Sequence, residues 1–306
     1  MRHQKSKVHK DNWTSVIALT LIVATALLVA HSVWAQAPGQ QTFPSAQAAA
    51  DALVSAFQNN DDQALSKILG PDAKDILTCG DEKQDKADRE QLVQKYREMH
   101  RLVTEPDGTT TVYIGAENWP FPFPLVQKKG SWYFDSEAAK NEVLYRRIGE
   151  DELTAIQVLH ELADGEKDYY KRAHGGQTDG QYAQKIDSDP GTQDGLYWES
   201  SADNSQSPIG PALGAAGEPF LGYYFRVLVS QGPGARGGAH DYVDNGKMTR
   251  GFAMLAYPAK YGSTGVMTFI TGEDGTVYQK DLGPNTAEAV KSITRYDPDS
   301  SWQKAE

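Results

Sequence analysis

Residues 150–173 read EDELTAIQVLHELADGEKDYYKRA and carry the longest helical pattern in the chain. Their apolar residues recur every three or four positions, which predicts an amphipathic helix of about five turns. The acidic residues at 150–152 suit the start of such a helix, because the helix dipole favours negative charge there. The apolar face is formed by Leu153, Ile156, Leu159 and Leu162 or Ala163.

The sequence after this helix is first rich in glycine and then in β-branched and aromatic residues. Residues 174–222 have the composition of a long loop. The residues Gly272-Glu273-Asp274-Gly275 predict a hairpin connection between two strands. A helix followed by an antiparallel sheet is an α+β arrangement. The predicted strands are 223–231, 251–259, 265–271 and 276–282.

The first half of the chain predicts three helices followed by strands. Ser45 fits the N-cap of a helix that ends at residue 58, and Asp61 fits the N-cap of a second helix that ends at Gly70. A third helix is expected to turn its apolar residues inward, namely Leu92, Val93, Tyr96 and Met99. The predicted strands are 109–115, 119–127 and 131–135, with a turn at 128–130.

The distribution of glycine divides the chain into two parts. Residues 1–170 contain 8 of the 28 glycines, so the second part has far more turns. The predicted organisation is a leader at 1–35, a linker at 36–42, a first domain at 43–147, a second domain at 148–297 and a C-terminal tail at 298–306.

The first 35 residues have the layout of a cleavable secretory signal peptide. Basic residues precede an apolar stretch of 15 residues, 16–30, which is short for a membrane span of ~20 residues. Val33 and Ala35 place small residues at the −3 and −1 positions of a cleavage site after Ala35. The alternative is an uncleaved signal that anchors the protein in the membrane.

The net charge of the chain is −11 at pH 7. Cleavage after Ala35 removes four basic residues and one acidic residue, which leaves −14. This charge argues against nucleic acid as a partner, because nucleic-acid binding needs a basic surface. The single cysteine, Cys79, excludes an internal disulfide and any multi-cysteine metal site. We therefore expect an acidic periplasmic or secreted protein with no membrane span after cleavage.

Two known folds resemble parts of this chain. Residues 43–147, with a D-x-x-A-L-x-x-I-L helix and a later G-x-W-x-F strand, resemble nuclear-transport-factor-like or SnoaL-like cone domains. The long helix with D-Y-Y, the later Y-Y-F-R-V and F-I-T-x-E-D-G-T-V-Y resemble the globular part of type IV pilins. The resemblances imply a cone-like module followed by a pilin-like one, without an N-terminal pilin stem.

Over nearly the whole mature chain, the sequence resembles the bacterial exported family called domain of unknown function 2950. The motifs that carry the resemblance are WPFPFPLV at 119–126, RRIGEDELTAIQ at 146–157, YYFRVLVSQGP at 223–233 and GFAMLAYPAKYGSTGVMTF at 251–269. The resemblance implies export and this two-part organisation, and it brings no assigned activity.

The segment WPFPFP at 119–124 alternates prolines with aromatic residues. In an extended strand the prolines project to one side, so the strand can form backbone hydrogen bonds along one edge only. Two interpretations are open. The segment either fills the interior of the cone, or it provides an aromatic wall or docking edge for a ligand or partner. The candidate binding residues are Trp119, Phe121, Phe123 and Trp132.

The glycine-rich residues 231–248 form the only segment with candidate catalytic residues. His240 beside Asp241 could act as an acid–base pair, and Arg236 could hold an anion. No nucleophile motif accompanies them, so a flexible hairpin or crossing loop is the simpler interpretation.

A second candidate site lies at residues 187–194, DSDPGTQD. Asp187, Asp189 and Asp194 could bind Ca²⁺, with Asp203 and Asn204 as further ligands, although their spacing departs from an EF-hand loop. A solvated turn is the alternative. No other cofactor is predicted, because the sequence has no HExxH motif, no P-loop and no dinucleotide-binding fingerprint.

Together these observations predict a non-catalytic envelope module that binds or assembles with another envelope protein through the aromatic strand edge or the glycine-rich loop. Two alternatives are kept. One is a periplasmic hydrolase centred on His240, Asp241 and Arg236. The other is a carrier of a small apolar ligand in the cone pocket near Trp119, Phe121 and Trp132.

Overall fold

A computed structural model of the chain describes residues 36–71, 82–173, 180–199, 207–210 and 218–305. The predicted leader and cleavage site at 1–35, and the predicted calcium ligands Asp203 and Asn204, lie outside these residues. The chain divides into two compact units, Met1–Val143 and Leu144–Glu306, called here the N-terminal and C-terminal units. Both combine helices with antiparallel sheets, which confirms the α+β class.

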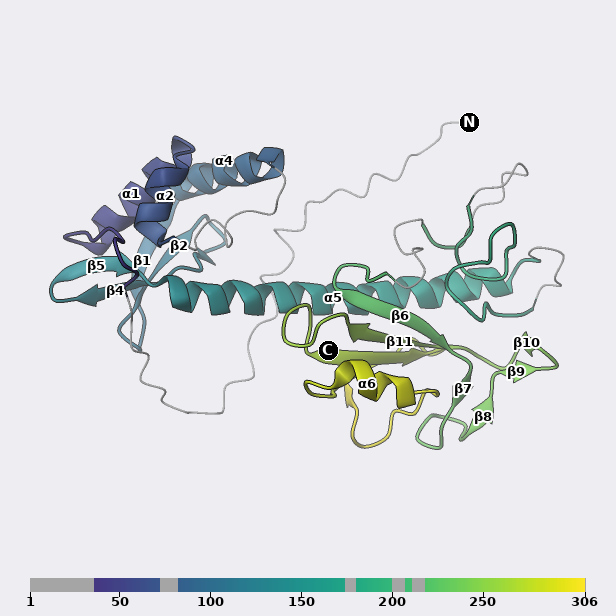
Figure 1. The fold of residues 1–306 in the computed structure, drawn as a ribbon. Coiled ribbons are helices and arrows are strands. Elements are labelled where there is room, and N and C mark those ends of the chain that lie inside the picture. Colours follow the sequence, from purple (N-terminus) through teal and green to yellow (C-terminus); the bar gives the residue numbers. More distant parts are fainter. Residues whose placement is uncertain (1–35, 72–81, 174–179, 200–206, 211–217, 306) are drawn as a thin grey trace, which may run out of the picture. The chain divides into compact units, whose positions relative to one another are not determined.

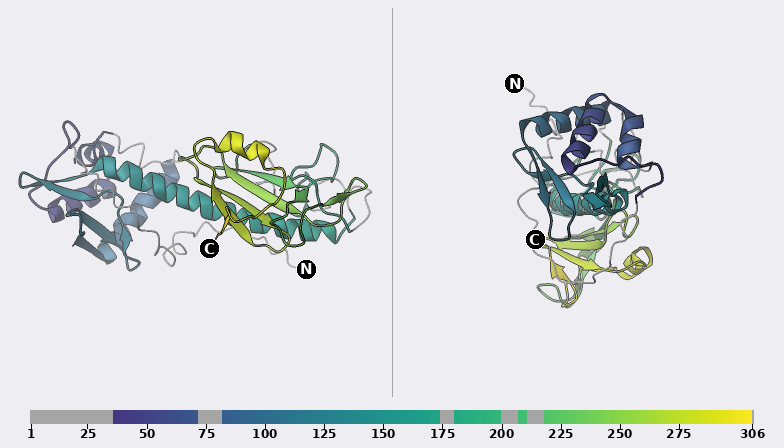
Figure 2. Two further views of the ribbon diagram at one scale, coloured as in Figure 1. Left: turned by 90° about the horizontal axis from the view of Figure 1, so that it is seen from below. Right: turned by 90° about the vertical axis from the view of Figure 1, so that its left-hand side faces the viewer.

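In the described residues of the N-terminal unit, three helices lie on one side of a five-stranded sheet (Figures 1 and 2). The sheet order is β1-β2-β4-β5, and β3 pairs with β2 next to β4. The helices are α1 (Ala46–Gln58), α2 (Asp62–Leu69) and α4 (Glu82–Glu98). The strands are β1 (His100–Thr104), β2 (Thr110–Ile114), β3 (Trp119–Pro120), β4 (Leu125–Lys128) and β5 (Ser131–Phe134).

Short-range signals set the helix ends and the last hairpin of this unit. The Ser45 hydroxyl accepts a hydrogen bond from Ala48 N and the Asp61 carboxylate accepts one from Ala64 N, so both predicted N-caps are confirmed. Lys129 and Gly130 adopt positive φ angles of 51° and 83°. That geometry is what a two-residue turn between β4 and β5 requires.

The C-terminal unit contains a five-stranded sheet of order β14-β13-β12-β11-β6. Helix α5 runs along one face of this sheet, and α6 lies on the opposite side (Figures 1 and 2). The Arg226 guanidinium donates to the carbonyls of Val290 and Ile293, which ties the segment after α6 to β6. The elements are α5 (Ser136–Tyr170, which starts in the N-terminal unit), β6 (Tyr223–Leu228), β11 (Ala253–Pro258), β12 (Met267–Gly272), β13 (Val277–Asp281), α6 (Thr286–Ala289) and β14 (Gln303–Lys304).

The glycine-rich residues 230–248 fold into short strand pairs. Strand β7 (Ser230–Gln231) pairs with β8 (His240–Asp241), and β9 (Val243–Asp244) pairs with β10 (Lys247–Met248). The Gln231 side chain donates to the carbonyls of Arg236 and Gly238 and accepts a hydrogen bond from the Tyr242 hydroxyl. This buried amide anchors the loop, and the antiparallel β7–β8 pair confirms the interpretation of this segment as a hairpin.

Helix α5 differs most from its prediction. It begins at Ser136, where the Asp135 carboxylate accepts hydrogen bonds from Glu137 N and Ala138 N. The residues at 150–152 therefore lie in the middle of the helix. The prediction that they stabilise its N-terminus through the helix dipole is wrong. Along the chain, the first unit ends at Val143 and the second begins at Leu144, inside α5. The sequence predicted this boundary after residue 147.

Four smaller differences have local causes. Strand β1 was not predicted, and Met99, expected in the core, is 42% exposed. The predicted strand 119–127 is split into β3 and β4, because Pro122 and Pro124 lack the N–H groups that would continue the ladder along β2. The predicted tail contains β14, which pairs with β13 and belongs to the sheet.

Candidate functional site

A hollow on the N-terminal unit lies between α4 and the end of β2. Its floor is apolar and its rim is polar, and only ≈ 20 Å³ of it is open to the centres of water molecules. That is room for about one or two waters. The lining residues are Asp88, Gln91, Leu92, Lys95, Ile114, Glu117 and Trp119.

Two local structures bring these residues together. Asp88, Gln91 or Leu92, and Lys95 follow each other at helical spacing on one face of α4. Trp119 is opposite Ile114 in the β2–β3 pair, after a tight turn in which Asn118 N donates to Gly115 O. The turn thus places Trp119 next to the hollow.

An ion pair closes one side of the hollow. Lys95 Nζ lies 2.8 Å from Glu117 Oε1, and the two side chains are 21% and 29% exposed. The hydrogen bond from Lys95 holds the pKa of Glu117 below its ordinary value. Glycine suits position 115 for two reasons. Its φ of +75° is a conformation that favours glycine, and an added Cβ would collide with the Glu117 carboxylate. The hollow therefore combines an apolar floor with a fixed pair of charges.

A wider groove follows the other side of α4. It has ≈ 440 Å³ of space open to the centres of water molecules, and its apolar floor is formed by Phe57 and Val93. Arg97 donates to the Gln58 side chain across it, at 2.6 Å. Helix α4 is thus flanked by two concave surfaces. The groove is lined by Phe57, Gln58, Asn60, Glu90, Val93, Gln94, Arg97 and Glu98.

The four predicted aromatic binding residues do not share one surface. Phe121 and Phe123 are buried, with ring centroids 5.4 Å apart, and Phe121 also contacts Phe134 edge-on. Trp132 is half-buried on β5 and its backbone pairs with that of Phe43. Only Trp119 lines the hollow. Phe121 and Phe123 are core residues here, which matches the interpretation that the segment fills the interior.

The predicted acid–base residues lie on the surface of the C-terminal unit. His240 and Asp241 are exposed on β8, and Arg236 is exposed in the preceding turn. His240 Nδ1 is 3.1 Å from Gly238 O, and its ring lies edge-on to Tyr242. Within the described part of the chain, no hydrogen bond joins His240 to Asp241 or to a side-chain hydroxyl. The arrangement lacks the enclosure that acid–base catalysis uses.

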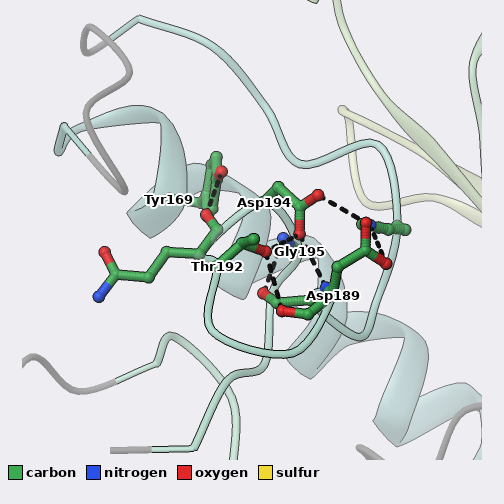
Figure 3. Close-up of polar contacts among 8 residues, drawn as sticks. Tyr169, Asp189, Thr192, Asp194 and Gly195 are labelled. Atoms are coloured by element: carbon green, nitrogen blue, oxygen red, sulfur yellow. Dashed lines mark hydrogen bonds and ion pairs between the residues drawn. The ribbon is translucent and has the colours of Figure 1, made fainter. Parts of the chain in front are cut away.

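Two of the predicted calcium residues, Asp189 and Asp194, lie close together in one loop (Figure 3) and pair with the same lysine. Lys185 Nζ lies 2.8 Å from Asp189 Oδ1 and 2.8 Å from Asp194 Oδ2. Asp194 also accepts hydrogen bonds from Thr192 Oγ1 and Asp189 N. Desolvation raises the pKa of Asp194, but the hydrogen bonds from Lys185 and Thr192 outweigh it and lower the pKa to about 2.

Asp187 is separate from this ion-paired pair of carboxylates. Its Oδ1 is buried without a hydrogen-bond partner among the described residues, and burial raises the pKa of its carboxyl. Across the described ranges, no group of three or more His, Cys, Asp or Glu residues could hold a metal ion. Calcium binding by this loop stays a prediction.

Two acidic residues of α5 face the sheet of the C-terminal unit. Glu152 Oε1 accepts hydrogen bonds from Val266 N and Met267 N, so it caps the start of β12. Asp151 lies against Gly222. Desolvation is the main cause that raises the pKa of Asp151 to about 6; Arg147 lowers it, and Glu150 and Glu152 raise it.

Asp151 should make the protein less stable as the pH rises. Its folded-state pKa lies above the ordinary value of 3.8, so the folded protein holds the proton more tightly and loses stability between about pH 4 and pH 6. Asp151→Asn should unfold at the same temperature as wild type at pH 4, and a few degrees higher at pH 7.5. Solvent screening limits the gain to about 1 kcal/mol. Thermal melts followed by circular dichroism test this, with exposed Glu161→Gln as the control; equal melting temperatures of Asp151→Asn and wild type at pH 7.5 would contradict it.

Lys95, Glu117 and the buried acid Glu166 were not predicted as functional residues from the sequence. Lys95 could have been noticed because it shares a helical face with Leu92, but its pairing with Glu117 depends on the turn at Gly115. Glu166 had a clearer signal. It interrupts an apolar stripe at helical spacing that contains Leu162 and Tyr169.

Comparison with known proteins identifies one family and no individual relative. No curated protein and no solved structure shows a significant match to the chain, so the likeness to cone and pilin modules stays a prediction. The described residues contain no helix with the length and apolar character needed to cross a membrane. The model of one family, described as protein of unknown function (DUF2950), matches residues 40–305. That match takes in both units, the hollow beside Trp119 and the loop around Lys185, and the chain therefore belongs to the DUF2950 family.

Proposed function

We propose that this protein is an exported, non-catalytic binding module, and that a partner protein of the cell envelope docks on α4 of its N-terminal unit. The docking site is the hollow beside Trp119. A single apolar side chain of the partner contacts its floor, and a polar or charged group contacts the Lys95–Glu117 pair. The observation that carries the proposal is this small hollow with an apolar floor and a fixed ion pair at its rim.

The size of the hollow favours a protein partner over a free ligand. Small-molecule sites usually enclose ~300–1,000 Å³. The space beside Trp119 is far smaller, and the aromatic rings of Phe121 and Phe123 fill the interior behind it. Protein interfaces, in contrast, are often anchored by one side chain in a small, well-packed pocket. The alternative of an apolar ligand held near Trp119 has less support for this reason. The groove on the other side of α4 is large enough for a small molecule, but most of its lining residues are polar.

The exposed positions of His240, Asp241 and Arg236 favour a binding role over hydrolysis. A general base needs a partner that orients it and a site that excludes water. Among the described residues, the His240 side chain forms a hydrogen bond only with the Gly238 carbonyl. If residues 231–248 have a function, an exposed loop held by Gln231 is better suited to contacting another protein.

Export is supported by the signal-like residues 1–35 and by the family match, which begins at residue 40, after the proposed cleavage site. We propose cleavage after Ala35 and a periplasmic or secreted mature protein. N-terminal sequencing of the protein recovered from fractionated cells tests this. A first residue of Gln36 supports cleavage, and an intact Met1 in the membrane fraction supports the anchored alternative.

Site-specific crosslinking tests the docking site. A photoreactive phenylalanine analogue at Gln91, which lines the hollow and is exposed, should give a discrete crosslinked product in intact cells. The same analogue at Gln127, exposed on β4, is the matched control and should give none. Adding Trp119→Ala should abolish the product from Gln91 while the melting temperature shows that the unit stays folded. Equal products from both positions, or a product that survives Trp119→Ala, would contradict docking at the hollow.

A further inference from the structure

Glu166 is the most deeply buried acidic side chain described in the protein, with no exposed surface. It lies on the face of α5 that also carries Leu159, Leu162 and Ala163, and these residues belong to the core of the C-terminal unit. Residues 180–198, called here the covering segment, pack over this end of the helix through Ala183 and Leu196. An acid at this position has to be either paired with a cation or kept neutral.

The contacts of Glu166 favour a neutral acid. Its Oε2 accepts a hydrogen bond from Ala183 N of the covering segment at 2.8 Å. Its Oε1 is buried and has no hydrogen-bond partner within the described part of the chain. A carboxylate with one donor and no counter-charge is costly to bury, whereas a carboxylic acid is tolerated. Burial accordingly raises the pKa of Glu166 well above its ordinary value.

The ionisable groups around Glu166 do not offset its charge. Tyr169 on α5 and Tyr182 on the covering segment are the groups whose pKa values its charge raises. Asp194 acts on Tyr169, and Glu273 accepts a hydrogen bond from the Tyr182 hydroxyl, so both add negative charge.

The remaining neighbours among the described residues supply no counter-charge either. Lys185, the cation of the covering segment nearest to Ala183 in sequence, pairs with Asp189 and Asp194. The neighbouring Gly165 packs against apolar Ile209. No described basic residue forms an ion pair with Glu166.

We propose that Glu166 is a pH-sensitive latch that holds the covering segment on α5 as a neutral carboxylic acid and releases it when it ionises. Its stabilising contribution is complete below the ordinary carboxyl pKa of 4.5 and declines as the pH rises towards the value in the folded protein. Ionisation forces the carboxylate to find water, and lifting the covering segment, together with Ala183, away from α5 exposes Glu166 to it. The C-terminal unit is thus closed in acid and opens locally in alkali.

Hydrogen exchange of peptides from the covering segment tests the latch. The ratio of exchange rates between wild type and Glu166→Gln at each pH cancels the intrinsic pH dependence of exchange. Glutamine keeps the acceptor for Ala183 N and cannot ionise. The ratio should rise by up to tenfold per pH unit once Glu166 begins to titrate, as the pH increases above the ordinary carboxyl pKa of 4.5. Glu161→Gln, an exposed change on the same helix, should follow wild type at every pH. A ratio that stays constant over this range would overturn the proposal.

An infrared measurement keeps the proposal testable if Glu166→Gln fails to fold. At a pH where the covering segment is still protected from exchange and ordinary carboxyls are ionised, the wild-type protein should show the C=O stretch of a protonated carboxyl group. The band should disappear as the covering segment begins to exchange faster at higher pH. The absence of such a band while the covering segment is still protected would show that Glu166 is charged in the closed state, and the latch would be wrong.

Discussion

Replacing Phe123 with alanine is expected to cost about 3–5 kcal/mol and to unfold the N-terminal unit near room temperature. Phe123 has no exposed surface and stacks on Phe121 at 5.4 Å. Its neighbours Pro122 and Pro124 stiffen the segment, so the chain around it cannot collapse into the cavity left by the ring. Urea unfolding followed by tryptophan fluorescence measures the loss.

Trp119→Ala is the matched comparison for this change. Trp119 belongs to the same proline-rich segment but is half-buried and lines the hollow. We expect this variant to lose less stability than Phe123→Ala and to lose partner crosslinking. An unchanged urea midpoint in Phe123→Ala would mean that the aromatic segment does not support the core. A larger stability loss in Trp119→Ala would mean that Trp119 is part of the core rather than of a docking site.

Gly195→Ala is expected to disrupt the covering segment of the C-terminal unit. An added Cβ would lie 2.7 Å from Asp187 C, 2.8 Å from Ile186 O and 2.8 Å from Ser188 N. All three are backbone atoms of the strand-like pairing between residues 185–188 and 195–197, beside the loop in Figure 3. Backbone cannot move aside as a flexible side chain can, so we expect a loss of about 3 kcal/mol or more. Thermal melts and hydrogen exchange of residues 180–198 measure it.

Gly149→Ala should have the opposite effect. Gly149 lies in the interior of α5, has ordinary helical φ, and has no atom within 4 Å of an added Cβ. Alanine is a better helix former than glycine by about 1 kcal/mol, so this variant should melt at a higher temperature than wild type. If Gly195→Ala melted like wild type while Gly149→Ala melted higher, the tight packing around Gly195 would be wrong.

Local sequence signals predicted the parts of the fold that local physics determines. Ser45 and Asp61 cap their helices, and the glycine and lysine at 129–130 form the β4–β5 turn as expected. The four main strands of the C-terminal unit fall where β-branched and aromatic residues predicted them. In each case the residues that make the structure are adjacent in the sequence.

The errors arise where distant contacts decide the structure. Residues 136–149 lack a continuous apolar stripe, and Tyr145 is 66% exposed, so periodicity alone could not show that α5 begins at Ser136. Strand β1 is half-exposed and is held by its ladder with β2. The hydrophobic pattern of these segments is too weak to predict a helix or strand from the sequence alone, because their structure depends on their partners.

The candidate site likewise combines a residue predicted from the sequence with contacts that only the fold brings together. Trp119 was singled out from the sequence, but the hollow requires α4, the turn at Gly115 and the Lys95–Glu117 pair to meet in space. Phe121 and Phe123 were indistinguishable from Trp119 by pattern, because alternation along a strand does not tell which aromatic ring the core will cover. Burial is a tertiary property, and only the fold separated these residues.

During synthesis, α5 is made long before the strands of the C-terminal sheet that cover it. Helix α5 is complete at Tyr170, but the strands that cover its apolar face begin at Tyr223, and the last one, β14, ends at Lys304. While the intervening chain is being translated, Leu159, Leu162 and their neighbours have no sheet to pack against. Pairings over such long sequence separations form slowly. A chaperone therefore has a wide interval in which to bind this helix before the chain folds around it.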